Sequence, residues 1–224
     1  MDWNQAIKDY KSYLKIERGL SLNSIVSYEN DTLSLKNYIL DNKIKESPIE
    51  CTPDTVNSFI YNSSKKNSPR SQARKISGLK SFFKFLVFEG YLKSSPMSNI
   101  ESPKLGRKLP DILNVEEISQ MISSINIKEK FGQRNKTIIE ILYGTGIRVS
   151  ELIELKISNI FFKENLIRVL GKGDKERFVP IGLKAKKSII DYINNDRKYQ
   201  KIEESSNDIL ILSKYGKKIT RHMI

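Results

Sequence analysis

One segment of the chain combines a glycine break, an arginine and a glutamate at a spacing that suits phosphate chemistry. Residues 142–152 read LYGTGIRVSEL, which predicts a helix that breaks at residues 144–146 and a short helix that begins at Arg148. Backbone amides at a helix N-terminus and a guanidinium would converge there on a phosphate oxygen. In the alternative interpretation, Gly-Thr-Gly is a plain turn between helices and Arg148 lies on the surface. This segment alone leaves both interpretations open.

A second group of cations follows about two dozen residues later, at the tip of a predicted hairpin. Residues 170–177 read LGKGDKER and bring Lys172, Lys175 and Arg177 within six residues of one another. Glycines on both sides of Lys172 would let the backbone approach a ligand closely. The spacing is wrong for a phosphate-binding P-loop, and a strand rather than a helix is predicted to follow. An ordinary solvated turn is the alternative interpretation.

The segment 68–90 predicts a helix whose polar face is purely basic. Ser68 and Pro69 are typical of a helix start, and Gly90 is typical of an end. At about 100° per residue, four cations fall in one arc of roughly 120°: Arg70, Arg74, Lys80 and Lys84. The segment from Ser68 to Phe88 holds five cations and no anion. A solvated face normally mixes signs, so this face favours phosphate contact over the alternative of a plain solvent face.

The scaffold for these segments is predicted to be mainly helical with a small antiparallel meander, an α+β fold. Apolar periodicity predicts four helices in an N-terminal domain, residues 1–91, at about 3–17, 21–41, 52–62 and 68–90. Three prolines and several serines predict a linker over residues 92–111. The C-terminal domain, residues 112–224, is predicted to hold helices from 114, at 134–143, 148–155 and 184–199, and strands at 160–162, 166–170, 177–181 and 209–212.

The composition alone leaves two interpretations open, a polyanionic partner or an ordinary basic protein rich in lysine, isoleucine and asparagine. The net charge is +13 and the pI about 9.6, with +4 up to Gly90 and +9 beyond, as expected if two basic domains clamp one polyanion. A single cysteine, Cys51, and a single histidine, His222, argue against a Cys/His metal site and favour a reducing cytoplasm. No run of about 18 apolar residues and no apolar leader is present, so neither a membrane span nor secretion is expected.

Together these features resemble the tyrosine recombinases, the phage integrase family, and above all its Xer-type chromosome-dimer resolvases. The resemblance covers essentially the whole chain and is carried by residues 17–21, Ser27, Tyr28, Asp31, and residues 68–86, 144–152 and 171–180. It implies an N-terminal SAM-like core-binding domain of four helices followed by an incomplete tyrosine recombinase catalytic domain.

The resemblance also implies roles in DNA strand cleavage and rejoining through a phosphotyrosine, with no metal and no other cofactor. Arg148 corresponds to the first catalytic arginine, which holds a non-bridging oxygen of the scissile phosphate. Lys172 corresponds to the hairpin lysine that protonates the departing 5′-hydroxyl. Glu151 resembles an acid that orients the arginine, although it could equally be an ordinary surface glutamate. The implied partner is a double-stranded recombination site, bound by a homo- or hetero-tetramer of recombinase protomers.

Eight residues are predicted to contact DNA. Most protein–DNA hydrogen bonds go to the sugar-phosphate backbone, so exposed cations are the first candidates. Phosphate contacts are expected from Arg70, Arg74, Lys80, Lys84, Lys175 and Arg177, with Ser27 and Tyr28 as lesser candidates.

The sequence departs from the family pattern where the rest of the catalytic site is expected. The 224 residues hold no His-x-x-Arg, and no tyrosine stands in the context of the nucleophile. Tyr192 is expected to pack on its helix, and Tyr215 to lie in a turn. Without a nucleophile no covalent intermediate forms, so the chain is expected to bind DNA without cutting it, to assemble weakly and to expose some apolar surface.

Two other functions stay open on the sequence alone. A non-catalytic DNA-binding protein from a split or decayed recombinase gene would occupy recombination sites as an accessory or a competitor. A basic RNA-binding or ribosome-associated protein would share the charge, but it leaves the two-domain plan and the combination of Arg148 with Lys172 unexplained.

Overall fold

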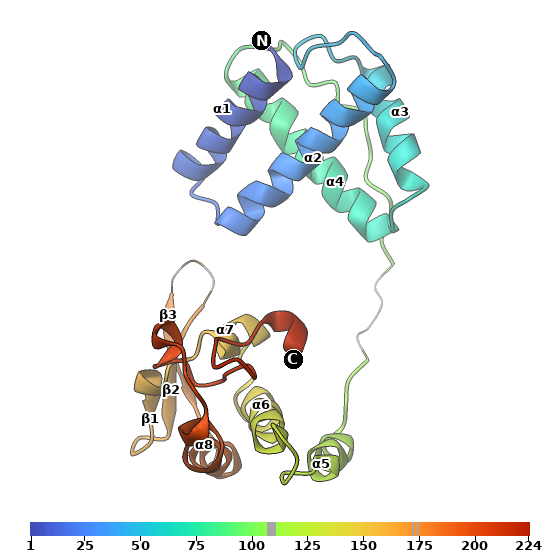
Figure 1. Ribbon diagram of the computed structural model, residues 1–224. Coiled ribbons are helices and arrows are strands. Elements are labelled where there is room, and N and C mark those ends of the chain that lie inside the picture. The colour runs from blue at the N-terminus through green and yellow to red at the C-terminus, as the bar shows by residue number, and fades with distance from the viewer. Residues whose placement is uncertain (107–110, 172, 174) are drawn as a thin grey trace. The chain divides into compact units, whose positions relative to one another are not determined.

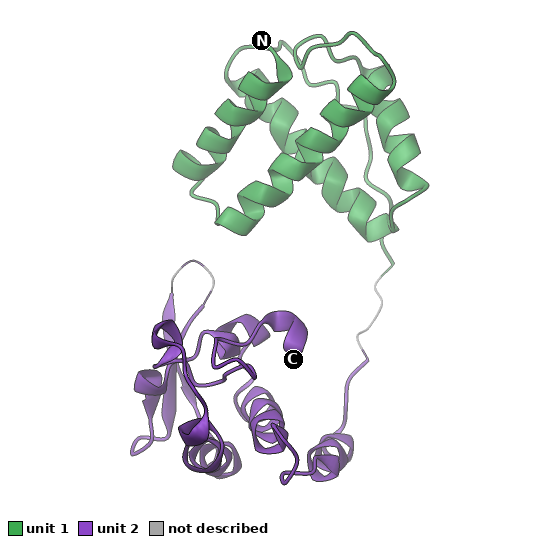
Figure 2. Ribbon diagram, viewed as in Figure 1, with its two compact units in different colours: residues 1–109 green, residues 110–224 purple. Residues whose placement is uncertain are grey.

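The computed structural model describes residues 1–106, 111–171, 173 and 175–224. The chain divides into two compact units, residues 1–109 and 110–224 (Figure 1; Figure 2). Each unit has its own hydrophobic core. The fold is mainly helical with a small three-stranded antiparallel sheet, which confirms the predicted class. In the described ranges, the helices are all too short or too polar to cross a lipid bilayer.

Unit 1 consists of four helices, as predicted: α1 (Trp3–Ile16), α2 (Leu22–Asp41), α3 (Pro53–Ser64) and α4 (Pro69–Phe88). Each helix has an N-cap residue whose side-chain oxygen accepts a hydrogen bond from a backbone amide of the first turn. These N-cap residues are Asp2, Ser21, Thr52 and Ser68 respectively. The amides of a first turn lack partners inside the helix, so such residues fix where a helix starts. Gly19 and Gly90 follow α1 and α4 with φ of 56° and 76°, which glycine adopts without strain.

The core of unit 1 is built around the apolar face of α4. Phe82 is fully buried and contacts Trp3 and Tyr10, with ring centroids 6.0 and 5.3 Å away. The predicted apolar face is buried at Ile76, Leu79, Phe82, Phe83 and Leu86, while Val87 is half-buried. Phe85, which the predicted face does not include, is also buried because α1 covers it through Tyr10, 5.4 Å away.

Part of the predicted linker belongs to unit 1. Met97 and Ile100 lie within the segment 92–111, yet both side chains are buried in the core of unit 1. The expectation of a linker that starts at residue 92 is therefore corrected for these residues. Two isolated apolar side chains between prolines and serines have no periodicity, so their burial leaves no mark in the sequence.

Unit 2 packs helices against the predicted meander. Its helices are α5 (Val115–Ser124), α6 (Gly132–Thr145), α7 (Val149–Ile153) and α8 (Leu183–Asn195), and its strands are β1 (Ile160–Phe161), β2 (Leu166–Leu170) and β3 (Glu176–Pro180). The strands pair antiparallel in the order β1-β2-β3. Ile167 and Val169 of β2 enter the core, whereas α5 has no buried residue among those described.

Two predicted elements of unit 2 differ in the structure. The helix expected at 184–199 ends at Asn195 and is followed by a 3-10 turn at Arg197–Tyr199. Residues 209–212 form only isolated bridges, Ile209 with Lys156 and Leu212 with Lys218, and are not a strand of the sheet. The side chains of residues 209–212 are all buried, so the apolar run indicates burial and not strand pairing.

Truncation of Phe82, the central aromatic residue of unit 1, should strongly destabilise the unit. Phe82→Ala is expected to lower the free energy of unfolding by about 3–5 kcal/mol, because the cavity loses the contacts with Trp3 and Tyr10. Urea unfolding followed by the fluorescence of Trp3, the one tryptophan of the chain, measures this unit. Phe88→Ala, at a ring that is 69% exposed, is the control and should cost less than about 1 kcal/mol. Equal losses in the two variants would contradict the assigned core.

Candidate functional site

The basic face of α4 is exposed as predicted. Arg70, Arg74, Lys80 and Lys84 all reach solvent, opposite the buried apolar face. Lys75, the cation outside the predicted arc, lies over the ring of Phe59 with its Nζ 5.5 Å from the centroid. The exposed face of α4 therefore carries only positive charge, which attracts polyanions.

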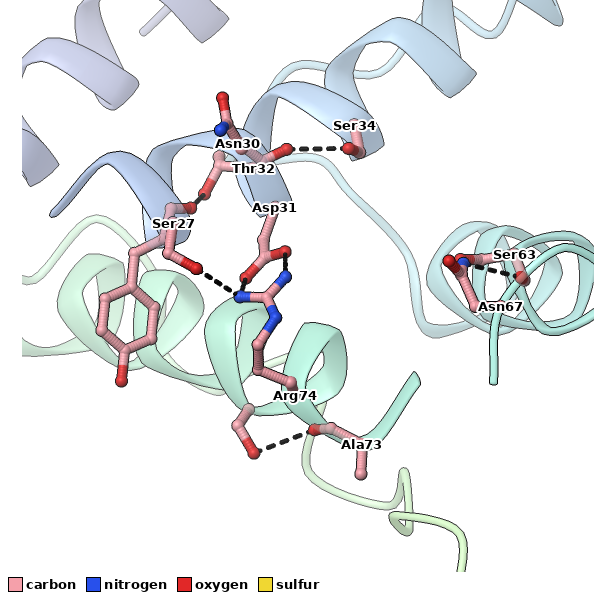
Figure 3. A network of polar contacts seen from close by, with 11 residues as sticks. Ser27, Asn30, Asp31, Thr32, Ser34, Ser63, Asn67, Ala73 and Arg74 are labelled. Carbon is pink, nitrogen blue, oxygen red and sulfur yellow. Dashed lines mark hydrogen bonds and ion pairs between the residues drawn. The ribbon is translucent and has the colours of Figure 1, made fainter. Parts of the chain in front are cut away.

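Arg74 differs from the other three cations because α2 holds it (Figure 3). Its Nη1 donates to Asp31 Oδ2 at 2.8 Å and to Ser27 Oγ at 2.7 Å. Its Nη2 donates to Asp31 Oδ1, which makes the ion pair bidentate. The Arg74 side chain is still 50% exposed, whereas that of Asp31 is 2% exposed. Ser27, a lesser candidate for DNA contact, thus accepts a hydrogen bond from Arg74.

The close approach of Asp31 to α4 depends on a glycine. A Cβ at Gly78 would overlap Asp31 Oδ2 and stand 2.9 Å from its Cγ, so another residue there would displace the carboxylate. Burial raises the pKa of Asp31, against the hydrogen bond and the charge of Arg74, which lower it. The sequence alone did not indicate this pairing, because Arg74 and Asp31 are 43 residues apart.

A second buried carboxylate lies in unit 2, at Glu151 of α7. Arg148 is the N-cap of α7; its backbone N–H donates to Glu151 Oε2 at 2.8 Å and its Nη1 to Oε1 at 3.0 Å. Arg177 of β3 donates from Nη1 to Oε1 and from Nη2 to Oε2, both at 2.8 Å. Glu151 therefore joins α7 to β3 and holds two of the predicted functional arginines.

Burial and the two neighbouring arginines, Arg148 and Arg177, determine the pKa of Glu151 and the net charge of this cluster. The side chain of Glu151 is 4% exposed, which rules out the alternative of an ordinary surface glutamate. Hydrogen bonds from Arg177 and Arg148 lower the pKa of Glu151 from its ordinary 4.5 to about 2, although its burial opposes the shift. One negative and two positive groups leave a net positive charge, and the Arg148 side chain is 67% exposed. The arrangement can present a fixed guanidinium to an anion.

The hairpin between β2 and β3 carries the remaining predicted cations. Lys172 lies outside the described residues, so its placement relative to Arg148 stays a prediction. Lys175 is exposed, and its carbonyl accepts from the Gly171 amide at 2.8 Å. A Cβ at Gly171 would come within 3.0 Å of Arg177 Nη1, so this glycine leaves room for the arginine that reaches Glu151.

The three tyrosines considered in the sequence, Tyr28, Tyr192 and Tyr215, lie in different environments. Tyr192 is fully buried in α8, where its hydroxyl accepts from the Leu212 amide at 3.2 Å, and Tyr215 is exposed in a turn. Tyr28 is half-buried and packs against the core of unit 1. Both expectations for Tyr192 and Tyr215 are therefore confirmed, and Tyr28 has a packing role that the sequence did not predict.

Comparison with domain families covers both units. Residues 7–90 match the family described as "Phage integrase, N-terminal SAM-like domain", and residues 111–224 match the "Phage integrase family". The first match covers most of α1 and all of α2, α3 and α4, and the second covers nearly all of unit 2.

Individual relatives match along almost the whole chain. A protein named "Tyrosine recombinase XerD" from Listeria innocua is 34% identical over 219 residues, which cover 97% of this chain and 74% of the relative. A protein of the same name from Oceanobacillus iheyensis is 36% identical, over 96% of this chain and 73% of the relative.

Solved structures share the fold at lower identity. A XerH site-specific recombinase bound to a palindromic difH substrate aligns with a TM-score of 0.70 and 22% identity, over 97% of this chain and 64% of that one. A lambda integrase tetramer bound to a Holliday junction aligns with a TM-score of 0.73 and 14% identity, over 100% and 63%.

The lowered pKa of Glu151 makes a pH-dependent prediction. A carboxyl whose pKa is lower in the folded state stabilises the fold above its ordinary pKa and loses that contribution as pH falls toward the folded value. Glu151→Gln should therefore destabilise unit 2 at pH 7, and its difference from the wild type should narrow below about pH 4.5. Urea unfolding followed by far-ultraviolet circular dichroism from pH 7 to 3 measures this. Glu164→Gln, in the exposed turn between β1 and β2, is the control. A pH-independent difference for Glu151→Gln would contradict the assignment.

Proposed function

Because the chain belongs to the phage integrase family of site-specific tyrosine recombinases, we propose that it binds a double-stranded recombination site and supplies two catalytic cations for strand cleavage and rejoining. The observation that carries this proposal is the identity of 34–36% to proteins named tyrosine recombinase XerD over 96–97% of the chain. The reaction proceeds through a phosphotyrosine and uses no metal, and it takes place on DNA in the cytoplasm.

The chemistry assigned to unit 2 is stabilisation of a phosphoryl transition state. Attack on a phosphodiester accumulates negative charge on the non-bridging oxygens, and a cation already in place stabilises it without reorganisation. Arg148 takes this role: Glu151 fixes one of its terminal nitrogens, and the Arg148 side chain as a whole is 67% exposed. Glu151 acts through Arg148 and is a positioning residue. Lys172 is proposed to protonate the leaving 5′-hydroxyl.

The DNA contacts are assigned to cations in each unit that reach solvent, all of them exposed except the half-buried Arg177. In unit 1 they are Arg70, Arg74, Lys80 and Lys84 on α4, and in unit 2 they are Lys175 and Arg177. Arg177 has both terminal nitrogens on Glu151, so it would reach a phosphate through its Nε edge. These contacts recognise backbone charge and not base sequence, so they contribute salt-dependent affinity for any duplex.

Assembly with further recombinase protomers is part of the same proposal. The support is fold likeness to a chain taken from a lambda integrase tetramer on a Holliday junction. We propose that this protein joins a homo- or hetero-tetramer of recombinase protomers on DNA.

Binding to DNA and the role of the hairpin are tested together. The wild-type chain should bind a duplex of about 30 base pairs at low salt, with affinity that falls steeply as salt rises. Lys175→Ala should raise Kd and reduce the salt slope by about one phosphate contact. Fluorescence anisotropy at several salt concentrations measures both. Lys163→Ala removes the same charge from the β1–β2 turn, at the opposite end of β2, and should leave the slope unchanged. A wild-type chain that binds no duplex would refute the proposed function.

A polypeptide of these 224 residues should bind DNA without a covalent step. No tyrosine among them stands in the context of the family's nucleophile, and Tyr192 is buried in α8. Incubation with a nicked suicide substrate, followed by denaturing electrophoresis, should show no protein–DNA adduct, which also suits a non-catalytic accessory or competitor. A trapped adduct would show that one of the present tyrosines reaches the phosphate.

A further inference from the structure

The guanidinium of Arg74 offers two edges for paired hydrogen bonds. The end edge consists of Nη1 and Nη2, and the side edge consists of Nε–H and the second N–H of Nη2, which point in parallel. Asp31 occupies the end edge, and Ser27 accepts the remaining hydrogen of Nη1. Three of the five donors are therefore engaged within unit 1.

The side edge is left for a ligand. Among the described residues, none accepts a hydrogen bond from Arg74 Nε–H or a second one from Nη2. The side chain is 50% exposed, while its partner Asp31 is buried. Two parallel donors on a planar cation match two oxygens of one phosphate group. Arg70, four residues earlier on the same exposed face of α4, adds a second cation to this part of the surface.

We propose that Asp31 is a positioning residue for DNA binding, which holds Arg74 so that its Nε–Nη2 edge receives one backbone phosphodiester. This inference rests on the proposed function, because it names how one of the assigned cations reaches the duplex. A free arginine must lose side-chain freedom when it binds, and that loss weakens binding. Asp31 and Ser27 remove the loss beforehand, since both terminal nitrogens are already fixed.

A purely structural role for the pair makes a different prediction. If Asp31 only joined α2 to α4, its charge would partly cancel that of Arg74 and weaken attraction to DNA. Removal of the carboxylate charge would then strengthen binding by any protein that stayed folded. Positioning predicts the opposite sign, because the loss of orientation outweighs the gain of one positive charge at the salt concentrations where long-range attraction is screened.

The test compares two variants that remove the same charge from the same helix. Asp31→Asn should raise Kd for the duplex about three- to tenfold at about 0.15 M salt, as expected when one immobilised side chain is released. Glu29→Gln, whose partner is Lys11 at 2.8 Å on the surface of α1 and α2, should leave Kd unchanged or lower it. Fluorescence anisotropy gives Kd, and the fluorescence of Trp3 with thermal unfolding confirms that each variant is folded.

The outcomes separate this inference from the proposed function. If the wild type binds and folded Asp31→Asn binds as tightly or more tightly, the positioning role is refuted while DNA binding stands. If the wild type binds no duplex, the proposed function fails and the positioning role falls with it. If Asp31→Asn does not fold, Arg74→Lys decides: an ammonium keeps the charge but has no side edge, so Kd should rise by a similar factor, and an unchanged Kd would overturn the inference.

Discussion

Each unit keeps a buried carboxylate charged by pairing it with an arginine that reaches solvent. A carboxylate removed from water is unfavourable by several kcal/mol unless charge and hydrogen bonds compensate it. Arg74 compensates Asp31 in part, since burial still raises the pKa of Asp31, whereas Arg177 and Arg148 lower the pKa of Glu151. The hydrogen bonds that compensate the charge of the carboxylate also fix the orientation of the arginine side chain. Each buried acid is therefore paired with cations of fixed orientation, Arg74 in unit 1 and Arg148 and Arg177 in unit 2.

These pairs also connect the elements of each unit. Asp31 joins α2 to α4, and Glu151 joins α7 to β3. In unit 1 one guanidinium pairs with one carboxylate, so the pair has no net charge. Its effect is to orient the guanidinium of Arg74. In unit 2 two guanidinium groups meet one carboxylate, so a positive charge remains for an incoming anion. The same few contacts thus connect the elements of each unit and fix the direction of the arginine side chains.

What the sequence could predict depended on local rules. The helix starts at Ser21, Thr52 and Ser68 follow from capping, and the meander follows from period-two patterns between turns. The one-sided charge of α4 was visible because its cations are neighbours in sequence. The partner of Arg74 lies 43 residues away, and that of Arg177 lies 26 residues away, so only the tertiary structure reveals them. The sequence cannot distinguish the buried run at 209–212 from a strand, because burial and strand pairing produce the same apolar pattern.

Gly78 reverses a common rule of protein engineering. Glycine within a helix usually weakens it, and replacement by alanine at an exposed site strengthens it by about 1 kcal/mol. Here the added methyl group would occupy the space of the Asp31 carboxylate. A substitution chosen to make α4 a better helix would therefore displace the Asp31 carboxylate and disturb its pairing with Arg74. In this protein, a more thermostable variant should not be sought at that position.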